Sequence, residues 1–177
     1  MARDYEMEAA VTAVEGRVAE PIVRALVVGA PGSQDGSIKG ALTSLFGRSR
    51  REGGLHTRNV LVLTATTISV FSCRSRGWPP PVDGEVGTWS VTAMTIEAVA
   101  DEKWSAFNAS DSGSVTNRFY GIRLTPADGS APIELEVARS DSARTTIQAL
   151  EDATGSAPSN ITGRRRAKQR RDADGSR

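Results

Sequence analysis

Cysteine and histidine are nearly absent from this 177-residue chain, which contains one of each, Cys73 and His56. One cysteine cannot form a disulfide within the chain, and a lone thiol in an apolar strand acts as a small hydrophobic side chain. One Cys and one His also exclude a thiolate–imidazole zinc site within one chain. Nucleophilic catalysis usually needs a histidine base held by a third group, and His56 lies in a Gly- and Arg-rich loop. We therefore expect no enzyme, no metal and no cofactor.

Long apolar runs are also absent. No segment approaches the roughly 18 apolar residues that a transmembrane helix needs, and the acidic first ten residues do not resemble a secretory signal. Together with the unpaired cysteine, this predicts a cytoplasmic protein. The turn at 27–33 begins like a phosphate-binding loop. However, Gln34, Asp35 and Gly36 occupy the positions of the Gly, Lys and Ser/Thr that this motif requires, so we expect an ordinary turn after a strand.

Charge is distributed unevenly. Residues 158–177 hold seven basic and two acidic groups, net +5, whereas the first 157 residues hold 15 and 19, net −4. The basic cluster is formed by Arg164, Arg165, Arg166, Lys168, Arg170 and Arg171. Such a segment attracts phosphate-rich polymers and anionic membranes without reading a sequence, and it has no interleaved aromatic residue on which bases could stack. A disordered, solubilising end and a weak polyanion-binding tail are both consistent with residues 156–177.

The first third of the chain predicts two helices around one strand. Residues 4–19 carry an apolar stripe at helical spacing, formed by Met7, Val11, Val14 and Val18, and Pro21 ends this segment. A strand is expected over 22–28. In the segment 33–57, a second stripe is formed by Ile38, Ala41, Leu42, Leu45 and Phe46, with Lys39, Arg48, Arg50, Arg51 and Arg58 around it. We interpret this segment as a surface helix packed on a sheet and followed by a basic loop; the alternative is a membrane or ligand contact.

The middle of the chain predicts strands. Two β-rich runs within 58–74 form a hairpin, although no Asn-Gly or Asp-Gly defines its turn. The Gly-Trp-Pro-Pro-Pro segment at 77–81 is interpreted as a stiff connection with Trp78 packed back on the body, and a polyproline ligand is the alternative. A strand pattern over 86–98 changes register near Ala93, through either a bulge or a turn. The polar residues 100–117 predict a loop.

The clearest local signal is a second hairpin. Apolar and polar residues alternate over 120–125 and 133–138 around a Pro-Ala-Asp-Gly turn, which predicts one buried and one solvated face, with Glu134 and Glu136 on the solvated one. Such strand carboxylates are far more often solvated than catalytic. A final amphipathic helix should begin after Ser140 and end near Gly155.

This order of elements resembles the pleckstrin-homology-like fold, including its GRAM-type and bacterial members. The resemblance rests on the hairpin Val60–Thr64 to Ile68–Phe71, the Trp89–Val91 strand, the hairpin Tyr120–Ile122 to Ile133–Val137 and the helix that ends near Leu150. It implies an α+β domain in which about seven antiparallel strands form a curled barrel or sandwich closed by a C-terminal helix. The expected division is an N-terminal helix over 1–20, the domain over 21–155 with its insertion at 33–57, and a basic tail over 156–177.

The resemblance also implies a non-enzymatic binding module that contacts a protein partner or an anionic membrane surface, with peripheral attachment in the latter case. Members often bind anions beside the first hairpin, so Lys39, Arg48, Arg50 and Arg51 are expected to contact headgroup phosphates and Leu45 and Phe46 to insert shallowly. Two alternatives stay open: a nucleic-acid-associated protein that binds through its tail, and a structural domain that self-associates through a sheet edge.

Overall fold

A computed structural model describes residues 5–31, 54–110 and 113–162, and it describes 101–110 and 113–118 by their backbone alone. Within these residues the protein is an α+β domain with two antiparallel sheets, of strand order β1-β2-β3-β4 and β5-β6-β7. In chain order the elements are α1 (Tyr5–Ala13), β1 (Arg24–Val28), β2 (Arg58–Leu63), β3 (Thr67–Cys73), β4 (Val82–Ser90), the 3-10 helix η2 (Val91–Ala93), β5 (Met94–Ser110), β6 (Gly113–Pro126), β7 (Ile133–Ala138), α3 (Asp141–Thr154) and the 3-10 helix η3 (Asn160–Thr162).

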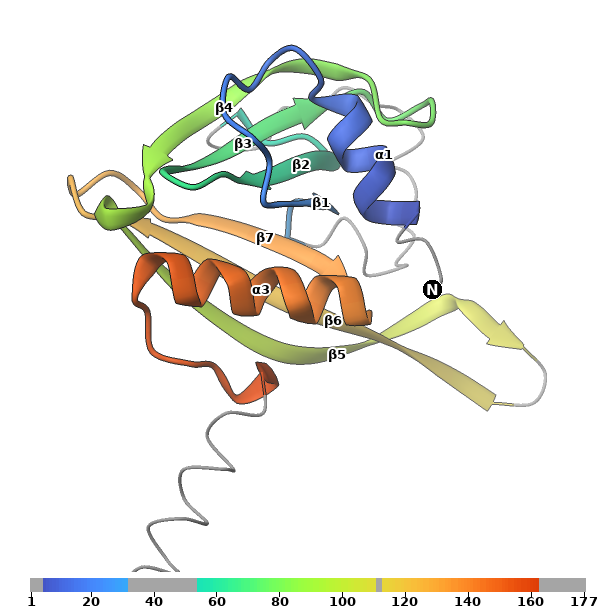
Figure 1. The fold of residues 1–177 in the computed structure, drawn as a ribbon. Coiled ribbons are helices and arrows are strands. Elements are labelled where there is room, and N and C mark those ends of the chain that lie inside the picture. The colour runs from blue at the N-terminus through green and yellow to red at the C-terminus, as the bar shows by residue number, and fades with distance from the viewer. Residues whose placement is uncertain (1–4, 32–53, 111–112, 163–177) are drawn as a thin grey trace, which may run out of the picture.

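The first sheet is covered on both faces. Leu61 and Leu63 of β2 face a main core, while Val60 and Val62 face a second, smaller one, because side chains alternate along a strand. The main core also takes Leu26, Val28, Ile68 and Val70 from the first sheet, Met94, Ile96, Ile122, Leu124, Leu135 and Val137 from the second, and Ala143, Ile147 and Leu150 from α3. The second core lies under α1, which supplies Ala10 and adjoins Val14 (Figure 1).

The β2–β3 hairpin turns without any glycine. The Thr64 hydroxyl, which is almost fully buried, accepts the amide of Thr67 at 2.9 Å and that of Thr66 at 3.3 Å, while the Thr64 amide donates to the Thr67 carbonyl at 2.9 Å. No non-glycine residue in the described chain has a positive φ. A side-chain hydroxyl thus replaces the Asn-Gly chemistry that the turn lacks.

The sheets pack as a sandwich that is joined at one corner. Gly29, just after β1, and Glu136 of β7 exchange backbone hydrogen bonds of 2.7 and 2.8 Å as an isolated antiparallel bridge. The chain crosses from β4 to β5 through η2, so the change of register near Ala93 is a turn and not a bulge. The described strands form two antiparallel sheets and do not close into a barrel.

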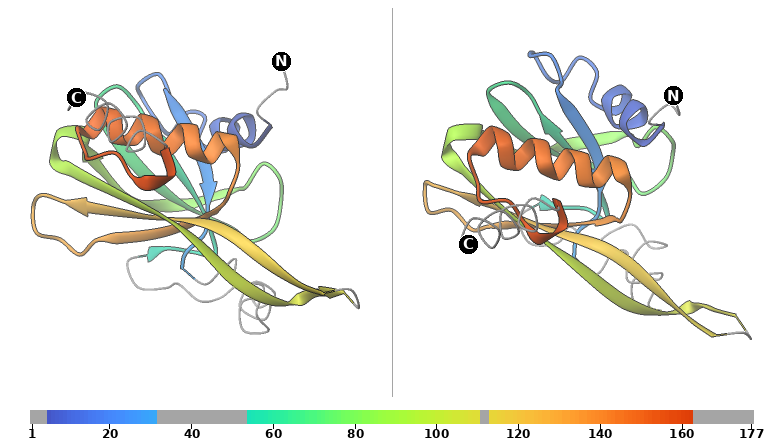
Figure 2. Two further views of the ribbon diagram at one scale, coloured as in Figure 1. Left: turned by 90° about the horizontal axis from the view of Figure 1, so that it is seen from below. Right: turned by 60° about the horizontal axis from the view of Figure 1, so that its bottom comes forward.

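The loop expected over 100–117 is wrong, because most of these residues extend β5 and β6. The two strands pair from Met94↔Pro126 to Ser105↔Val115 and again at Ser110↔Gly113, and the resulting ribbon projects beyond the rest of the domain (Figures 1 and 2). Backbone hydrogen bonds hold an antiparallel pair regardless of side-chain polarity. The polar composition of this segment therefore did not predict its secondary structure.

The C-terminal helix follows its capping signals, whereas the N-terminal helix is shorter than expected. The Ser140 hydroxyl accepts the Ala143 amide at 3.1 Å at the start of α3, and Gly155 ends the helix in the left-handed region at φ 67°. The first helix is shorter than the expected 4–19: it ends at Ala13, and Gly16 adopts φ 74° in the turn that follows. Helical spacing was therefore informative over the first turns only.

The chain continues to pack on the domain after Gly155, although the tail was expected to begin at 156. The buried Glu151 carboxylate accepts the Ser159 amide at 2.8 Å, the Ser156 hydroxyl accepts the Ile96 amide at 2.9 Å, and Ile161 of η3 adjoins the main core. The basic residues of the tail lie in 163–177, outside the described residues. None of the described helices is both long and apolar enough to cross a membrane.

The turn chemistry predicts a specific loss of stability. Thr64→Val keeps the side-chain shape but removes the hydroxyl that accepts two amides, so we expect the free energy of unfolding to fall by about 1–2 kcal/mol. Thr64→Ser keeps the hydroxyl and should lose less than Thr64→Val. Urea unfolding of the two variants, monitored by circular dichroism, measures both. A valine variant as stable as the serine variant contradicts this role of the hydroxyl.

Candidate anion-binding site

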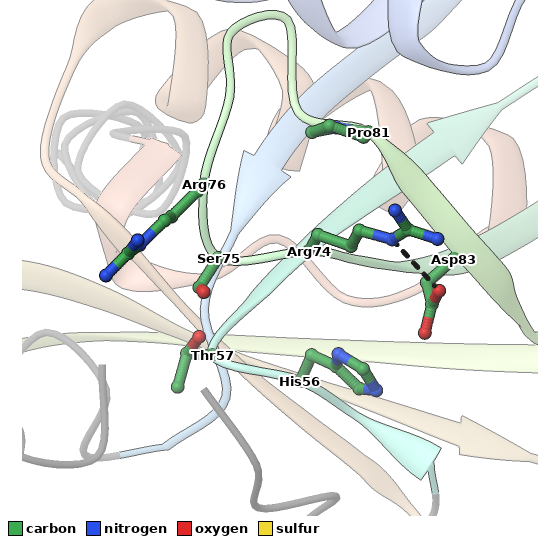
Figure 3. Close-up of a pocket in the computed structure, with 7 residues that line it drawn as sticks. All are labelled: His56, Thr57, Arg74, Ser75, Arg76, Pro81 and Asp83. Carbon is green, nitrogen blue, oxygen red and sulfur yellow. Dashed lines mark hydrogen bonds and ion pairs between the residues drawn. The ribbon is translucent and has the colours of Figure 1, made fainter. Parts of the chain in front are cut away.

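A pocket of about 520 Å³ lies at the end of the first sheet where β2 begins and β3 ends. We call the connection between β3 and β4 the 74–81 loop. The pocket is bounded by this loop, by the segment leading into β2 and by the start of β4, and it is lined by His56, Thr57, Arg74, Ser75, Arg76, Pro81 and Asp83 (Figure 3). It thus collects two guanidinium groups, two hydroxyls, one imidazole and one carboxylate.

The segment leading into β2 is held by Asn59. Its fully buried side chain donates from Nδ2 to the His56 carbonyl at 2.8 Å and accepts the His56 amide through Oδ1 at 3.0 Å. Both ends of the side-chain amide are therefore satisfied by one residue of the pocket wall. This pairing fixes the backbone of His56 against the sheet.

The opposite wall is held by Arg58. Its Nη1 atom donates to the Ser75 carbonyl at 3.1 Å and to the Gly77 carbonyl at 3.0 Å, so the guanidinium spans the 74–81 loop. The same guanidinium lies 5.6 Å from the centre of the Trp78 ring, within cation–π distance. Asn59 and Arg58 are neighbours in β2 and point to opposite sides of the sheet. One strand end therefore positions both walls.

The charged groups are placed to receive an anion. Arg74 makes one ion pair, Nε to the Asp83 carboxylate at 3.4 Å, between side chains that are 72% and 36% exposed, so this pair contributes little to stability. Arg76 extends away from that pair on the far side of the Thr57 and Ser75 hydroxyls (Figure 3). No carboxylate of the described residues pairs with Arg76. Its charge and hydrogen-bond donors remain available to a ligand.

His56 lines the same pocket and carries a buried polar side-chain atom. Its Nε2 has no hydrogen-bond partner among the residues that the structure describes, although its main-chain amide and carbonyl are both paired. Buried polar atoms of this kind are unusual unless a ligand or water satisfies them. The imidazole, the two hydroxyls and the two guanidinium groups form a donor set suited to phosphate oxygens.

Cys73 lies near this pocket but offers no nucleophile. The residue is fully buried in the second core, and this burial raises the pKa of its thiol to about 11 despite the opposing charges of Arg58 and Arg17. The thiolate is the reactive form, and almost none is present at neutral pH. This agrees with the expected role of Cys73 as a small core residue.

A second hollow, of about 340 Å³, lies on the outer face of the second sheet. Arg123 donates there to Glu134 at 2.6 Å, each side chain being half exposed, and Glu97 adjoins them. Glu136 was expected on the solvated face with Glu134, but it is only 7% exposed beside the Gly29 bridge.

The expected site residues all fall outside the described residues. Lys39, Leu45, Phe46, Arg48, Arg50 and Arg51 lie in 32–53, and Arg164, Arg165, Arg166, Lys168, Arg170 and Arg171 lie in 163–177. Trp78 was expected to pack back on the body; it stacks on Tyr5 of α1 but remains 46% exposed.

Sequence reasoning missed Arg74 and Arg76. Their signal was the Arg-Ser-Arg triplet that ends the first hairpin, directly before the proline-rich segment. The triplet was overlooked because the density of basic residues is greater in the insertion and in the tail. The comparison of the sequence with protein-family models and with curated proteins found no match.

The Asn59 clamp predicts a pH-dependent variant. Asn59→Asp keeps the acceptor for the His56 amide but replaces the donor to the His56 carbonyl with a buried negative charge, so we expect a loss of about 2 kcal/mol or more at pH 7. Burial raises the pKa of such a carboxyl above the value of about 4 that it has in the unfolded chain. The buried group therefore takes up a proton and loses its unfavourable charge as the pH falls. Its deficit relative to wild type should therefore shrink as the pH falls from 7 to 4. An equal deficit at both pH values, measured by urea unfolding, contradicts the clamp.

The buried thiol predicts slow labelling. At pH 8 a pKa of about 11 leaves about a hundred-fold less thiolate than the usual value of 9.0. Cys73 in the native protein should therefore react at least that much more slowly with iodoacetamide than in urea. Because the pKa of the buried thiol is raised, the contribution of Cys73 to the free energy of unfolding is complete below the unfolded pKa. This contribution is lost as the pH rises through about 11. Equal labelling rates in native and unfolded protein contradict this placement.

Proposed function

We propose that this protein is a non-enzymatic binding module of pleckstrin-homology-like type that binds the phosphate groups of an anionic membrane surface. The fold supports this: seven described strands in two antiparallel sheets, with a C-terminal helix packed into the core between them. The order of the elements follows the expected one, apart from the long β5–β6 ribbon.

The observation that carries the proposal is the pocket at the end of the first sheet. It places Arg74 and Arg76 on either side of the Thr57 and Ser75 hydroxyls, and it also includes His56, whose buried Nε2 lacks a partner in the described chain. Guanidinium groups and hydroxyls are the usual ligands of phosphate oxygens. A preformed pocket also needs little ordering of side chains on binding, because Arg58 and Asn59 already hold its walls.

In sequence, the insertion that carries Lys39, Arg48, Arg50 and Arg51 directly precedes a segment that lines the pocket. The insertion joins β1 to the segment leading into β2, and that segment forms one wall of the pocket. In the proposal these four residues, with Leu45 and Phe46, extend the contact that Arg74 and Arg76 begin. A row of basic groups near an anionic surface contributes about 1 kcal/mol for each Lys or Arg.

Co-sedimentation with vesicles tests the proposal. The full-length protein should sediment with vesicles of phosphatidylcholine and phosphatidylserine, and not with phosphatidylcholine alone. The double variant Arg74→Glu/Arg76→Glu should lose about tenfold or more of this binding. Arg123→Glu/Arg144→Glu changes the net charge equally at residues that do not line the pocket and serves as the matched control. Equal binding by both double variants contradicts the assignment of the pocket.

Two further variants distinguish the contribution of the insertion to vesicle binding from that of the tail. Charge reversal at Lys39, Arg48, Arg50 and Arg51 together should weaken vesicle binding if the insertion shares the site. The tail is best removed after Thr162, because Ser159 and Ile161 belong to the folded domain. Truncation there should leave binding at physiological salt largely intact. Binding that disappears with the tail and depends steeply on salt favours a nonspecific polyanion or nucleic-acid function instead.

A further inference from the structure

Two of the large hydrophobic side chains exposed in the described residues are stacked on each other at the end of the first sheet. Tyr5 of α1 is 65% exposed and Trp78 of the 74–81 loop is 46% exposed. Their ring centres are 5.8 Å apart, with the planes inclined by 24°. We call them the aromatic pair. Both rings thus keep about half or more of their surface in water, which an ordinary core contact would have removed.

The aromatic pair is held in place rather than loosely attached. Arg58 stacks against Trp78 and donates to the carbonyls of Ser75 and Gly77, on the N-terminal side of the ring in the same loop. The Arg74 amide donates to the Pro81 carbonyl at 2.9 Å, which closes the base of the loop. Trp78 therefore projects from a loop that one backbone hydrogen bond closes at its base and that the Arg58 side chain spans.

The aromatic pair and the anion pocket belong to one surface. The 74–81 loop carries Trp78 as well as Arg74, Ser75 and Arg76 of the pocket, and Arg58 binds both parts of it. Tryptophan and tyrosine combine an apolar body with a polar end and accumulate at the headgroup level of bilayers. Arginines beside them attract anionic headgroups. An exposed aromatic pair next to a cationic pocket thus complements a bilayer surface in both polarity and charge.

We propose that the aromatic pair Tyr5–Trp78 is the element of this protein that enters the interface of an anionic bilayer while the pocket holds a headgroup phosphate. This inference rests on the proposed function and adds to it the residues that set depth and orientation. It assigns to α1 a role beyond covering the first sheet, because Tyr5 supports the Trp78 ring from that helix. The aromatic pair is an apolar membrane contact within the described residues, in addition to the contact expected at Leu45 and Phe46.

The test uses the fluorescence of Trp78. The chain has three tryptophans, so the full-length protein with Trp89→Phe and Trp104→Phe leaves Trp78 as the only one. Circular dichroism and vesicle sedimentation first establish that this variant folds and binds as the wild type does. Addition of phosphatidylcholine–phosphatidylserine vesicles should then shift the Trp78 emission to shorter wavelength. Phosphatidylcholine brominated near its headgroup end should quench that emission, whereas free bromide in solution should quench it less than before binding.

Substitutions provide a second, independent measurement. Trp78→Ala in the otherwise native chain should weaken sedimentation with anionic vesicles by about tenfold, since a large ring no longer leaves water. Trp78→Phe and Tyr5→Phe keep ring area and should lose less, which separates the loss of contact from misfolding. Val23→Ala removes an exposed apolar side chain just before β1, at the far end of the first sheet from the 74–81 loop, and should change nothing.

The outcomes separate this inference from the proposed function. Sedimentation that depends on Arg74 and Arg76, without any shift or lipid quenching of Trp78, overturns the inference and leaves the pocket assignment standing. Full sedimentation by Trp78→Ala does the same. A protein that binds no anionic vesicle at all overturns both. If a soluble protein partner shifts the Trp78 emission and no vesicle binds, the aromatic pair belongs to a protein interface. That result also overturns the inference.

Discussion

Burial of β2 on both faces is the constraint on which the rest of this structure depends. The run Val60–Leu63 sends alternate side chains into two cores, so one face must be covered by the second sheet with α3 and the other by α1. Each of these apolar side chains is worth about 1.5–3 kcal/mol when buried, which is large beside the stability of a small domain. The terminal helix α1 is therefore part of the fold, since without it Val60 and Val62 would face water.

The same strand also organises the candidate site. At the start of β2, Arg58 and Asn59 point to opposite sides of the sheet. Their side chains hold the two walls of the pocket by hydrogen bonds to main-chain groups. These are hydrogen bonds to main chain, so they fix loop geometry independently of the side chains that would touch a ligand. The pocket and the aromatic pair thus both lie at the start of β2, and a ligand bound at one would be oriented by the other.

Much of the fold was predictable from local signals. The hairpins over 58–74 and 120–138 and the capped helix from Ser140 to Gly155 are confirmed, because each depends on residues close in sequence. The solvated face predicted for the second hairpin is wrong at Glu136, which is buried. The extension of β5 and β6 was missed, since its polar composition hides backbone pairing between segments. The pocket was missed for another reason: Arg74, His56 and Asp83 are brought together by strand pairing, which no single stretch of sequence displays. The basic residues selected for their density lie outside the described part of the chain, so their role stays a prediction.

We propose that the pocket formed by Arg74, Arg76, Thr57 and Ser75 receives a phosphate group. A direct test is a titration of the ¹⁵N-labelled full-length protein with glycerophosphoserine, a soluble headgroup that carries no acyl chain and so avoids any contribution from membrane insertion. We expect saturable amide shifts that centre on residues 56–57 and 74–76, together with a shift of the His56 side-chain signal. Shifts confined to the basic tail, or spread evenly over surface arginines without saturation, would contradict it.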